Sequence, residues 1–336
     1  MTSFLRRLIV FSWVLLCLVS LQAYGATYQY FRLGSTKDVE TTPHAGIAMM
    51  GGGKDLDQAF SWLCKHGGGG DFLVLSAIGD DAYNSYINGL CKTNSVSTLV
   101  IPDQVAAADK NVLEIIHHAE ALFIVGGNQA RYINFWRGTP VQDAINADVA
   151  HGIPIGGTSA GLAVLGQFSY GALGDKPDDN DLASTDVLPN PCHDRVTLAR
   201  DFLVVPHLEN TITDSHFAKR DRMGRSLGFM ARILQDGWSK NVREIAIDER
   251  SAVLVDGDGK GLVVGSGRGA YFMQPSKAPA VCQKGVPLTF TDISVFHGPA
   301  GATFNLNSWT GEGGESYTLS VNRGVIESSK ANHSIY

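Results

Sequence analysis

Short apolar runs that end at glycines alternate with amphipathic stretches through residues 46–166. The runs predict strands, and the amphipathic stretches, whose apolar residues recur near helical spacing, predict helices. Strands are predicted at Gly46–Met50, Phe72–Ser76 and 96–102, and within ALFIVGG from Ala121 and GIPIGG from Gly152; helices are predicted from about Asp55 to Gly67, from about Asp81 and after the fourth strand. Strands that are apolar throughout and alternate with helices predict an α/β domain, with a mostly parallel sheet flanked by helices on both faces.

The pattern changes to short strands and turns from about Ala246. AVLVDGDGKGLVVG predicts a hairpin with a Gly/Asp turn, and FTDISVFHG and SYTLSVNRG predict further strands. The acidic segment Gly171 to Arg200 contains prolines and is interpreted as a long loop or flap. We expect an α/β domain over residues 27–269 and a β-rich C-terminal extension over residues 270–336.

The N-terminus has the order of a secretory signal peptide: Arg6 and Arg7, an apolar run from Leu8 to Leu21, then small residues. The run is shorter than the ~20 residues of a spanning helix, so a membrane anchor is the weaker interpretation. A signal peptide over residues 1–25 predicts a secreted or periplasmic protein. Its removal takes away two positive charges and changes the net charge from −6 to −8. We therefore expect no nucleic-acid partner and no membrane contact after processing.

Four cysteines remain after the signal peptide: Cys64, Cys91, Cys192 and Cys282. In an oxidising compartment they could form two disulfides in three connectivities. Cys64 and Cys91 both lie in segments interpreted as helices and are a candidate pair, but the sequence leaves the pattern open.

Ser159 lies in Gly157-Thr158-Ser159-Ala160-Gly161, which fits G-x-S-x-G between a predicted strand and a predicted helix. At a sharp strand-to-helix turn, side chains two residues before and after the serine would collide, so glycines are needed there. Such a turn exposes the hydroxyl and directs the N–H of Ala160 toward a developing oxyanion. The alternative is a packing turn with an ordinary serine.

A nucleophilic serine needs a base, and His216 is the strongest candidate among ten histidines, with His207 a weaker one. His216 follows a β-branched run and precedes a segment rich in arginine. A solvated cationic helix is the alternative interpretation of that segment. The sequence offers neither metal-ligand spacing nor a dinucleotide or phosphate motif in the right context, so we expect no metal and no cofactor.

GGTSAGLAVLG, DSHFAKRDRMGR, FIVGGNQ and IAIDE together resemble the motifs of the cyanophycinases, serine peptidases related to aspartyl dipeptidases. The motifs occur in the family's order and span most of residues 45–265. The resemblance implies the fold of class I glutamine amidotransferases. It also implies a nucleophile at Ser159, a general base at His216 and an orienting acid at Glu249.

Further roles come from the same resemblance. Gly127 and Asn128 would supply a second oxyanion donor beside Ala160. The substrate pocket would be formed by Gln129, Asp214, Ser215, Arg220, Arg222 and Arg225. That pocket recognises a β-aspartyl residue linked through its side chain to arginine, and arginine forks suit carboxylates. Ser215 replaces the family's usual glutamine and Asn128 its frequent aspartate, and these departures concern the substrate rather than the peptidase chemistry.

These observations predict a secreted serine exopeptidase that hydrolyses cyanophycin to β-Asp-Arg dipeptides through an acyl-enzyme. The partners expected are cyanophycin or β-aspartyl peptides, and the resemblance suggests a homodimer. The alternatives are an isoaspartyl or aspartyl dipeptidase of the same family, an α/β-hydrolase esterase with its acid between Asp175 and Glu209, and a non-catalytic peptide-binding homologue. The order Ser, His, Glu separates the first scheme from an α/β-hydrolase, whose acid precedes its histidine.

Overall fold

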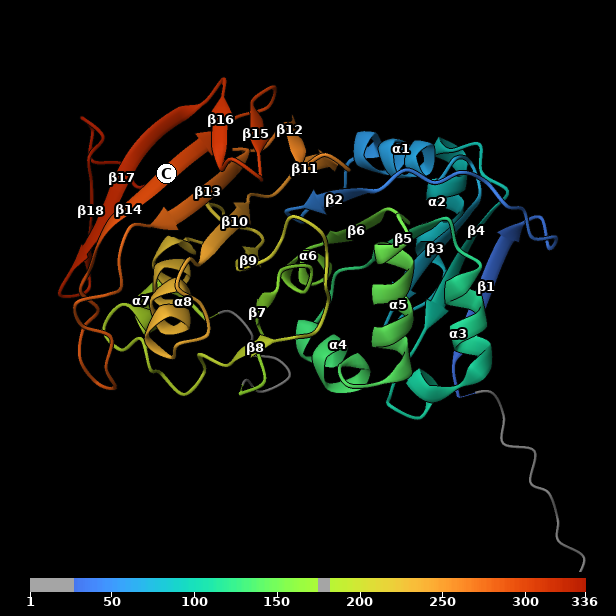
Figure 1. Ribbon diagram of the computed structural model, residues 1–336, viewed down its shortest axis with the longest axis horizontal. Helices are drawn as coiled ribbons and strands as arrows, with labels where there is room; N and C mark the ends of the chain where they lie inside the picture. The colour runs from blue at the N-terminus through green and yellow to red at the C-terminus, as the bar shows by residue number, and fades with distance from the viewer. Residues whose placement is uncertain (1–26, 175–181) are drawn as a thin grey trace, which may run out of the picture.

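Two mixed β-sheets with helices packed against them form the computed structural model, which describes residues 27–174 and 182–336 (Figure 1). The expected signal peptide lies outside the described residues. Within those residues the first sheet has ten strands, ordered β1-β4-β3-β5-β6-β2-β11-β12-β15-β16. They are β1 (Gln29–Gly34), β2 (Gly46–Met50), β3 (Asp71–Ser76), β4 (Ser95–Val100), β5 (Ala121–Ile124), β6 (Ile155–Thr158), β11 (Ser251–Asp256), β12 (Lys260–Gly265), β15 (Thr303–Asn305) and β16 (Thr310–Glu312).

The centre of this sheet is parallel, with β4, β3, β5, β6 and β2 side by side. Helices connect these strands in chain order: α1 (Asp57–His66), α2 (Ala82–Leu90), α3 (Lys110–His117), α4 (Gln129–Trp136) and α5 (Pro140–Ala150). The five strands predicted from the apolar runs are therefore present. The outer strands β1, β11, β12, β15 and β16 pair antiparallel, so the sheet is parallel only at its centre.

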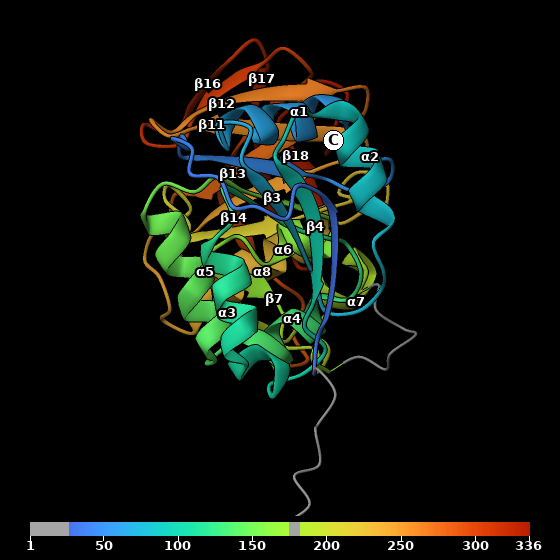
Figure 2. The ribbon, with the colours of Figure 1, turned by 90° about the vertical axis from the view of Figure 1, so that its right-hand side faces the viewer.

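Both faces of the first sheet are buried, and the side chains along each strand alternate between the two faces. Leu73 and Leu75 of β3 belong to the core that includes residues of α3 and α5. Phe72 and Val74 of the same strand belong to a separate core with residues of α1 and α2. Because successive side chains of a strand point to opposite faces, the helices must lie on both sides of the sheet, as Figure 2 shows. The predicted α/β fold with helices on both faces is confirmed.

The second sheet has eight strands within the described residues, ordered β18-β17-β14-β13-β10-β9-β7-β8. They are β7 (Phe168–Tyr170), β8 (Leu198–Arg200), β9 (Thr211–Asp214), β10 (Arg243–Ile247), β13 (Ala270–Pro275), β14 (Phe290–Gly298), β17 (Glu315–Asn322) and β18 (Val325–Ser328). β9 pairs parallel with β7 and with β10, and the other pairs are antiparallel. The strand-rich C-terminal region is confirmed, and its strands join both sheets.

The second sheet also lies between two layers. Residues of α8 (Met223–Gln235) share a core with Ala246 and Met273, while Ile245 and Phe272 pack toward the first sheet. The segment interpreted as a long loop contains α7 (Ser184–Val187) and β8, and residues 175–181 lie outside the described residues.

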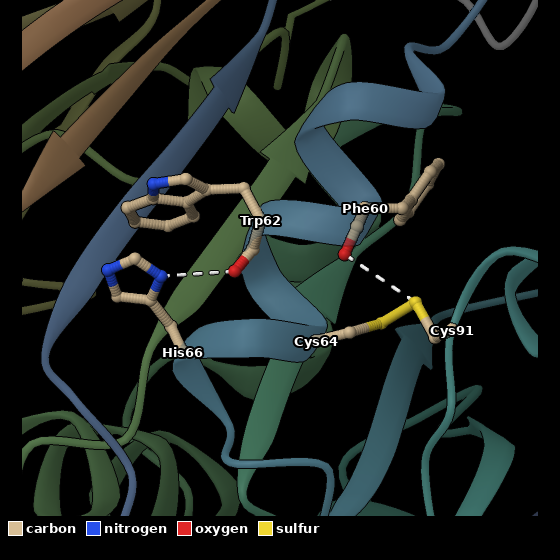
Figure 3. Close-up of a disulfide and its surroundings, with 5 residues drawn as sticks. All are labelled: Phe60, Trp62, Cys64, His66 and Cys91. Atoms are coloured by element: carbon tan, nitrogen blue, oxygen red, sulfur yellow. Dashed lines mark hydrogen bonds between the residues drawn. A yellow bond between two sulfur atoms is a disulfide. The ribbon is translucent and has the colours of Figure 1, made fainter.

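A disulfide joins Cys64, near the end of α1, to Cys91, directly after α2 (Figure 3). This is the candidate pair identified from the sequence, and its two cysteines are 27 positions apart in the chain. Cys192 and Cys282 are free thiols. The disulfide ties together the two helices that cover one face of the parallel strands.

Removing this disulfide should lower the free energy of unfolding. Closing a loop of this length is worth about 3–4 kcal/mol through the entropy of the unfolded chain. We expect the Cys64→Ala/Cys91→Ala double variant to unfold at a lower denaturant concentration than the oxidised protein, and at nearly the same concentration as the reduced wild type. Equal midpoints for the oxidised wild type and the double variant would contradict this expectation.

Candidate active site

Ser159 occupies a strained turn between β6 and the short helix α6 (Ala160–Ala163). Its φ is 53° and its ψ is −112°, a conformation that non-glycine residues rarely adopt. A Cβ atom on Gly157 would lie 2.6 Å from the backbone of Gly161, and one on Gly161 would lie 2.0 Å from the carbonyl oxygen of Ile124. The crowding predicted on either side of the serine is confirmed, and it explains why glycines are required there.

His216 and Glu249 reach Ser159 from the second sheet. His216 follows β9, Glu249 follows the neighbouring parallel strand β10, and Ala246 pairs with Asp214 between them. Nε2 of His216 lies 2.7 Å from Oγ of Ser159, and Nδ1 lies 2.7 Å from Oε1 of Glu249. With Glu249 ionised, Nδ1–H donates to the carboxylate, which leaves Nε2 to accept the serine proton. Among the described residues, the acid hydrogen-bonded to Nδ1 of His216 is therefore Glu249.

The surroundings keep His216 neutral and Glu249 ionised. Burial lowers the pKa of His216, and the nearby cations Arg220 and Arg222 lower it further, while Glu249 opposes them. The hydrogen bond from His216 lowers the pKa of Glu249, as do the charges of Arg220 and Lys219. A neutral imidazole that faces a hydroxyl on one side and a carboxylate on the other can act as a general base.

Gly51, Gly52 and Gly53, at the end of β2, form a cradle for the histidine and the acid. The backbone N–H of His216 donates to the carbonyl of Gly51 at 2.8 Å. A Cβ on Gly52 would lie 2.6 Å from the ring of His216, and one on Gly53 would lie 3.1 Å from Glu249. No role for these three glycines was predicted from the sequence. The signal was present, because three glycines followed a buried strand whose end lies at the same sheet edge as Ser159.

The GGNQ turn passes directly beside the serine. A Cβ on Gly126 would lie 3.4 Å from the Cβ of Ser159, and Gly127 has a φ of 132°. The side chain of Asn128 caps α4 by accepting from the backbone N–H of Ala130 at 2.9 Å. Gln129 is the first residue of that helix and is half-buried. Asparagine and aspartate cap helices about equally well, which gives a structural reason why Asn128 can replace aspartate.

Asp214 and Arg225 form a buried ion pair rather than an open pocket. Nε and Nη2 of Arg225 donate to the two carboxylate oxygens at 2.8 and 2.5 Å, and the two residues are only 3% and 2% exposed. The guanidinium also lies over the rings of Tyr170 and Phe229. Burial acts to raise the pKa of Asp214, but Arg225 and Arg222 hold it below its usual value. Arg225 and Asp214 therefore do not lie where direct contact with a substrate was expected.

Arg222 links this ion pair to the chain that leads into His216. Its Nη1 donates to the backbone carbonyl of Ser215 at 2.9 Å and lies 3.4 Å from Asp214. Ser215 is buried, and its N–H donates to Asp214 at 2.8 Å. Arg220 is exposed. The structure thus separates the six expected substrate residues into a buried group (Asp214, Ser215, Arg222 and Arg225) and a more accessible pair (Gln129 and Arg220).

In the described residues, no group of three or more histidine, cysteine, aspartate or glutamate side chains could hold a metal ion. The expectation of a site without metal or cofactor stays a prediction.

Comparison with known proteins gives one family and several relatives. The family model described as peptidase family S51 matches residues 80–263, which include Ser159, His216 and Glu249. A cyanophycinase from Geminocystis herdmanii is 28% identical over 190 residues, 53% of this chain and 62% of the relative. One from Synechococcus elongatus is 25% identical over 236 residues, 67% of each chain, and one from Trichormus variabilis is 27% identical over 175 residues, 51% of each. The chain therefore spans between about half and two thirds of the length of these relatives.

Two solved structures also match. A peptidase from an acI-B1 actinobacterium has a TM-score of 0.47 and 18% identity, covering 74% of this chain and 93% of its own. A putative peptidase E from Listeria monocytogenes has a TM-score of 0.42 and 12% identity, covering 67% of this chain and 100% of its own.

Replacing Gly52 with alanine should displace His216 and slow the reaction of Ser159 with diisopropyl fluorophosphate by at least about 100-fold, because a misplacement of ~1 Å has that effect. Gly152→Ala is the matched control. Gly152 has a φ of 92° against 89° for Gly52, but a Cβ there meets nothing within 4 Å. Both variants place alanine at nearly the same positive φ, and they differ in the clash. Equal rates for the two variants would contradict a cradle role for Gly52.

The same labelling rate should follow the protonation of His216. Because its pKa is lowered, the rate should rise with pH along a limb centred below 6.5, the ordinary histidine value. In Arg220→Gln a cation that disfavours the imidazolium is lost, so the limb should move to higher pH. Arg323→Gln, at the exposed turn between β17 and β18, should leave it in place. A limb that moves equally in both variants, or in neither, would refute this account.

Proposed function

Because the chain belongs to peptidase family S51, a family of serine-type hydrolases, we propose that it is a secreted serine exopeptidase that hydrolyses cyanophycin to β-Asp-Arg dipeptides. The observation that carries the proposal is the continuous relay from Ser159 through His216 to Glu249, with both hydrogen bonds at 2.7 Å. The names of the curated relatives supply the substrate class.

The reaction follows from the relay. Oγ of Ser159 attacks the carbonyl carbon of the scissile peptide bond while Nε2 of His216 accepts the hydroxyl proton. Glu249 stays ionised and stabilises the imidazolium that forms. His216 then gives the proton to the leaving amine, which departs and leaves an acyl-enzyme. A water molecule, deprotonated by the same histidine, hydrolyses that ester and restores the serine.

The developing oxyanion needs donors that are already in place. The N–H of Ala160 follows the strained serine. Gly127 and Asn128 directly follow Gly126, where an added Cβ would lie 3.4 Å from the Cβ of Ser159. We assign the oxyanion site to these backbone groups. Each such donor is worth about 3–4 kcal/mol of transition-state stabilisation.

Substrate recognition would combine the accessible and the buried groups. Gln129 and Arg220 would contact the β-aspartyl unit, with the guanidinium of Arg220 facing a carboxylate. Asp214 and Arg225 would act as positioning residues, because their ion pair and Arg222 fix the backbone of Ser215 just before His216. We also propose that the protein forms a homodimer, and this part of the proposal rests on the family resemblance alone.

Secretion is supported by the basic and apolar order of residues 1–25 and by the Cys64–Cys91 disulfide, since such bonds persist in oxidising compartments. Between residues 27 and 174 and between 182 and 336, the structure has no helix with the length and hydropathy needed to cross a bilayer.

A β-aspartyl dipeptidase of the same family is the second candidate. It is favoured by Ser215, a short and buried side chain where the family usually has glutamine. The smaller side chain removes a polar group from the expected pocket, which would weaken recognition of a polymer more than the chemistry.

The deciding experiment incubates the mature protein with insoluble cyanophycin and identifies soluble products by mass. We expect β-Asp-Arg from the wild type and a rate lower by about 10⁴–10⁶-fold for Ser159→Ala. Glu249→Gln should retain binding but lose about 10³–10⁴-fold in rate. Ser239→Ala is the matched serine control and should remain active. Ser239 donates a hydrogen bond to Asn210, and both residues precede the strands β10 and β9, at the ends away from Glu249 and His216.

Other outcomes are equally informative. Hydrolysis of β-aspartyl dipeptides without release from the polymer would select the second candidate. Full activity in Glu249→Gln would reject the Ser–His–Glu relay, and folded protein without either activity would reject the proposal.

A further inference from the structure

A basic cleft lies beside Glu249, which forms part of its lining. Its volume is about 700 Å³, and three segments line it: residues 218–219, 248–250 and 266–268. The first segment follows His216 by two residues and the second contains Glu249 itself. The cleft therefore shares Glu249 with the proposed active site, although none of its cations was singled out from the sequence.

Backbone contacts hold the three segments together. The N–H groups of Ser266 and Gly267 donate to the carbonyl of Arg250 at 2.9 and 3.0 Å. The N–H of Lys219 donates to Oδ1 of Asp248 at 2.8 Å. A Cβ on Gly267 would lie 1.9 Å from the carbonyl oxygen of Glu249, so only glycine allows this close approach. The walls of the cleft are fixed by the fold.

The charges in the cleft favour an anion. Lys219, Arg250 and Arg268 are exposed, and within the described residues their side chains have neither a hydrogen bond nor an ion pair. The two carboxylates already accept hydrogen bonds, Glu249 from His216 and Asp248 from Lys219. Three unpaired cations around one cavity are notable in a chain whose net charge is −6.

We propose that the basic cleft is a subsite for carboxylate groups of the substrate remote from the scissile bond. The inference rests on the proposed function and deepens it, because cyanophycin carries a free α-carboxylate on every arginine and another at its C-terminus. Ser159 is linked to the cleft through His216 and Glu249, by two hydrogen bonds of 2.7 Å each, and Glu249 is part of the cleft lining. An extended chain advances by ~3.3–3.6 Å per residue, so we assign the recognised carboxylate to a unit two or three residues from the attacked carbonyl.

The binding test uses Ser159→Ala, which cannot form the acyl-enzyme, and a synthetic three-unit β-Asp-Arg oligomer. Binding is measured by calorimetry for this protein and for the same protein with Lys219→Gln, Arg250→Gln and Arg268→Gln combined. We expect the triple change to raise the Kd about tenfold or more, and each single change about two- to fivefold, as for exposed charge pairs. Arg323→Gln is the matched control and should leave the Kd unchanged.

Two modified oligomers identify the carboxylate. One has an amidated C-terminus and the other has amidated arginine carboxylates. The oligomer that lacks the recognised group should bind more weakly to the unmodified cleft, with no further loss in the triple variant. The proposal would be overturned if amidation weakened binding by the same factor in the protein with the three cations and in the triple variant, for both oligomers.

Steady-state kinetics of the triple variant and the wild type, both with Ser159 intact, provide a second readout. A subsite predicts that the triple variant raises KM by a larger factor than it lowers kcat. A lowered kcat with unchanged KM would mean that the cations only tune Glu249, and the proposal would fail.

The two proposals fail differently. Cleft-dependent binding without hydrolysis would refute the proposed function and keep the cleft. Hydrolysis with an unchanged KM and Kd in the triple variant would refute the cleft and keep the function. Absence of both binding and hydrolysis would refute both.

Discussion

The close approach of several backbone segments around Ser159 is the constraint on which the rest of the site depends. Ser159 can present its hydroxyl only because the chain turns sharply after β6, and that turn leaves no room for side chains at Gly157 and Gly161. The same limit applies at the end of β2, where Gly52 faces the ring of His216. Glycine at these positions is needed for space more than for flexibility, since the parallel strands end at one crowded edge.

The buried ion pair of Asp214 and Arg225 gives the second sheet a fixed connection to this edge. Removing one partner of such a pair costs about 3–5 kcal/mol, because the other is left charged and buried. Glu244 lies fully buried nearby, and burial together with the charge of Asp214 raises its pKa well above the usual range. Both effects favour the uncharged form of Glu244, in which it adds no charge to the cluster. The positive charge of Arg225 stays committed to Asp214, which anchors the chain just before His216.

Local sequence patterns were sufficient to predict the strands, helices and turns that depend on neighbouring residues. Strand and helix alternation predicted the parallel centre of the first sheet, and the match to peptidase family S51 over residues 80–263 confirms the resemblance drawn from motifs. Ser159 was recognisable because its turn imposes glycines at fixed spacing. Strand β1 and the pairing of the second sheet were not predicted, because such pairing depends on segments far apart in the chain. Arg225 was misplaced because an arginine in a cationic segment gives no sign of burial.

The relay also requires that the two sheets keep a fixed relation to each other. Ser159 ends β6 in the first sheet, while His216 follows β9 in the second. Glu249 lies in the short crossing from β10 to β11, and the N–H of Asp248, just before it, donates to the carbonyl of Gly269. β13 pairs with β10 along its length, so strands after residue 270 hold the strand that carries Glu249. A hydrogen bond of 2.7 Å tolerates little displacement, and these C-terminal strands therefore contribute directly to the scaffold of the site.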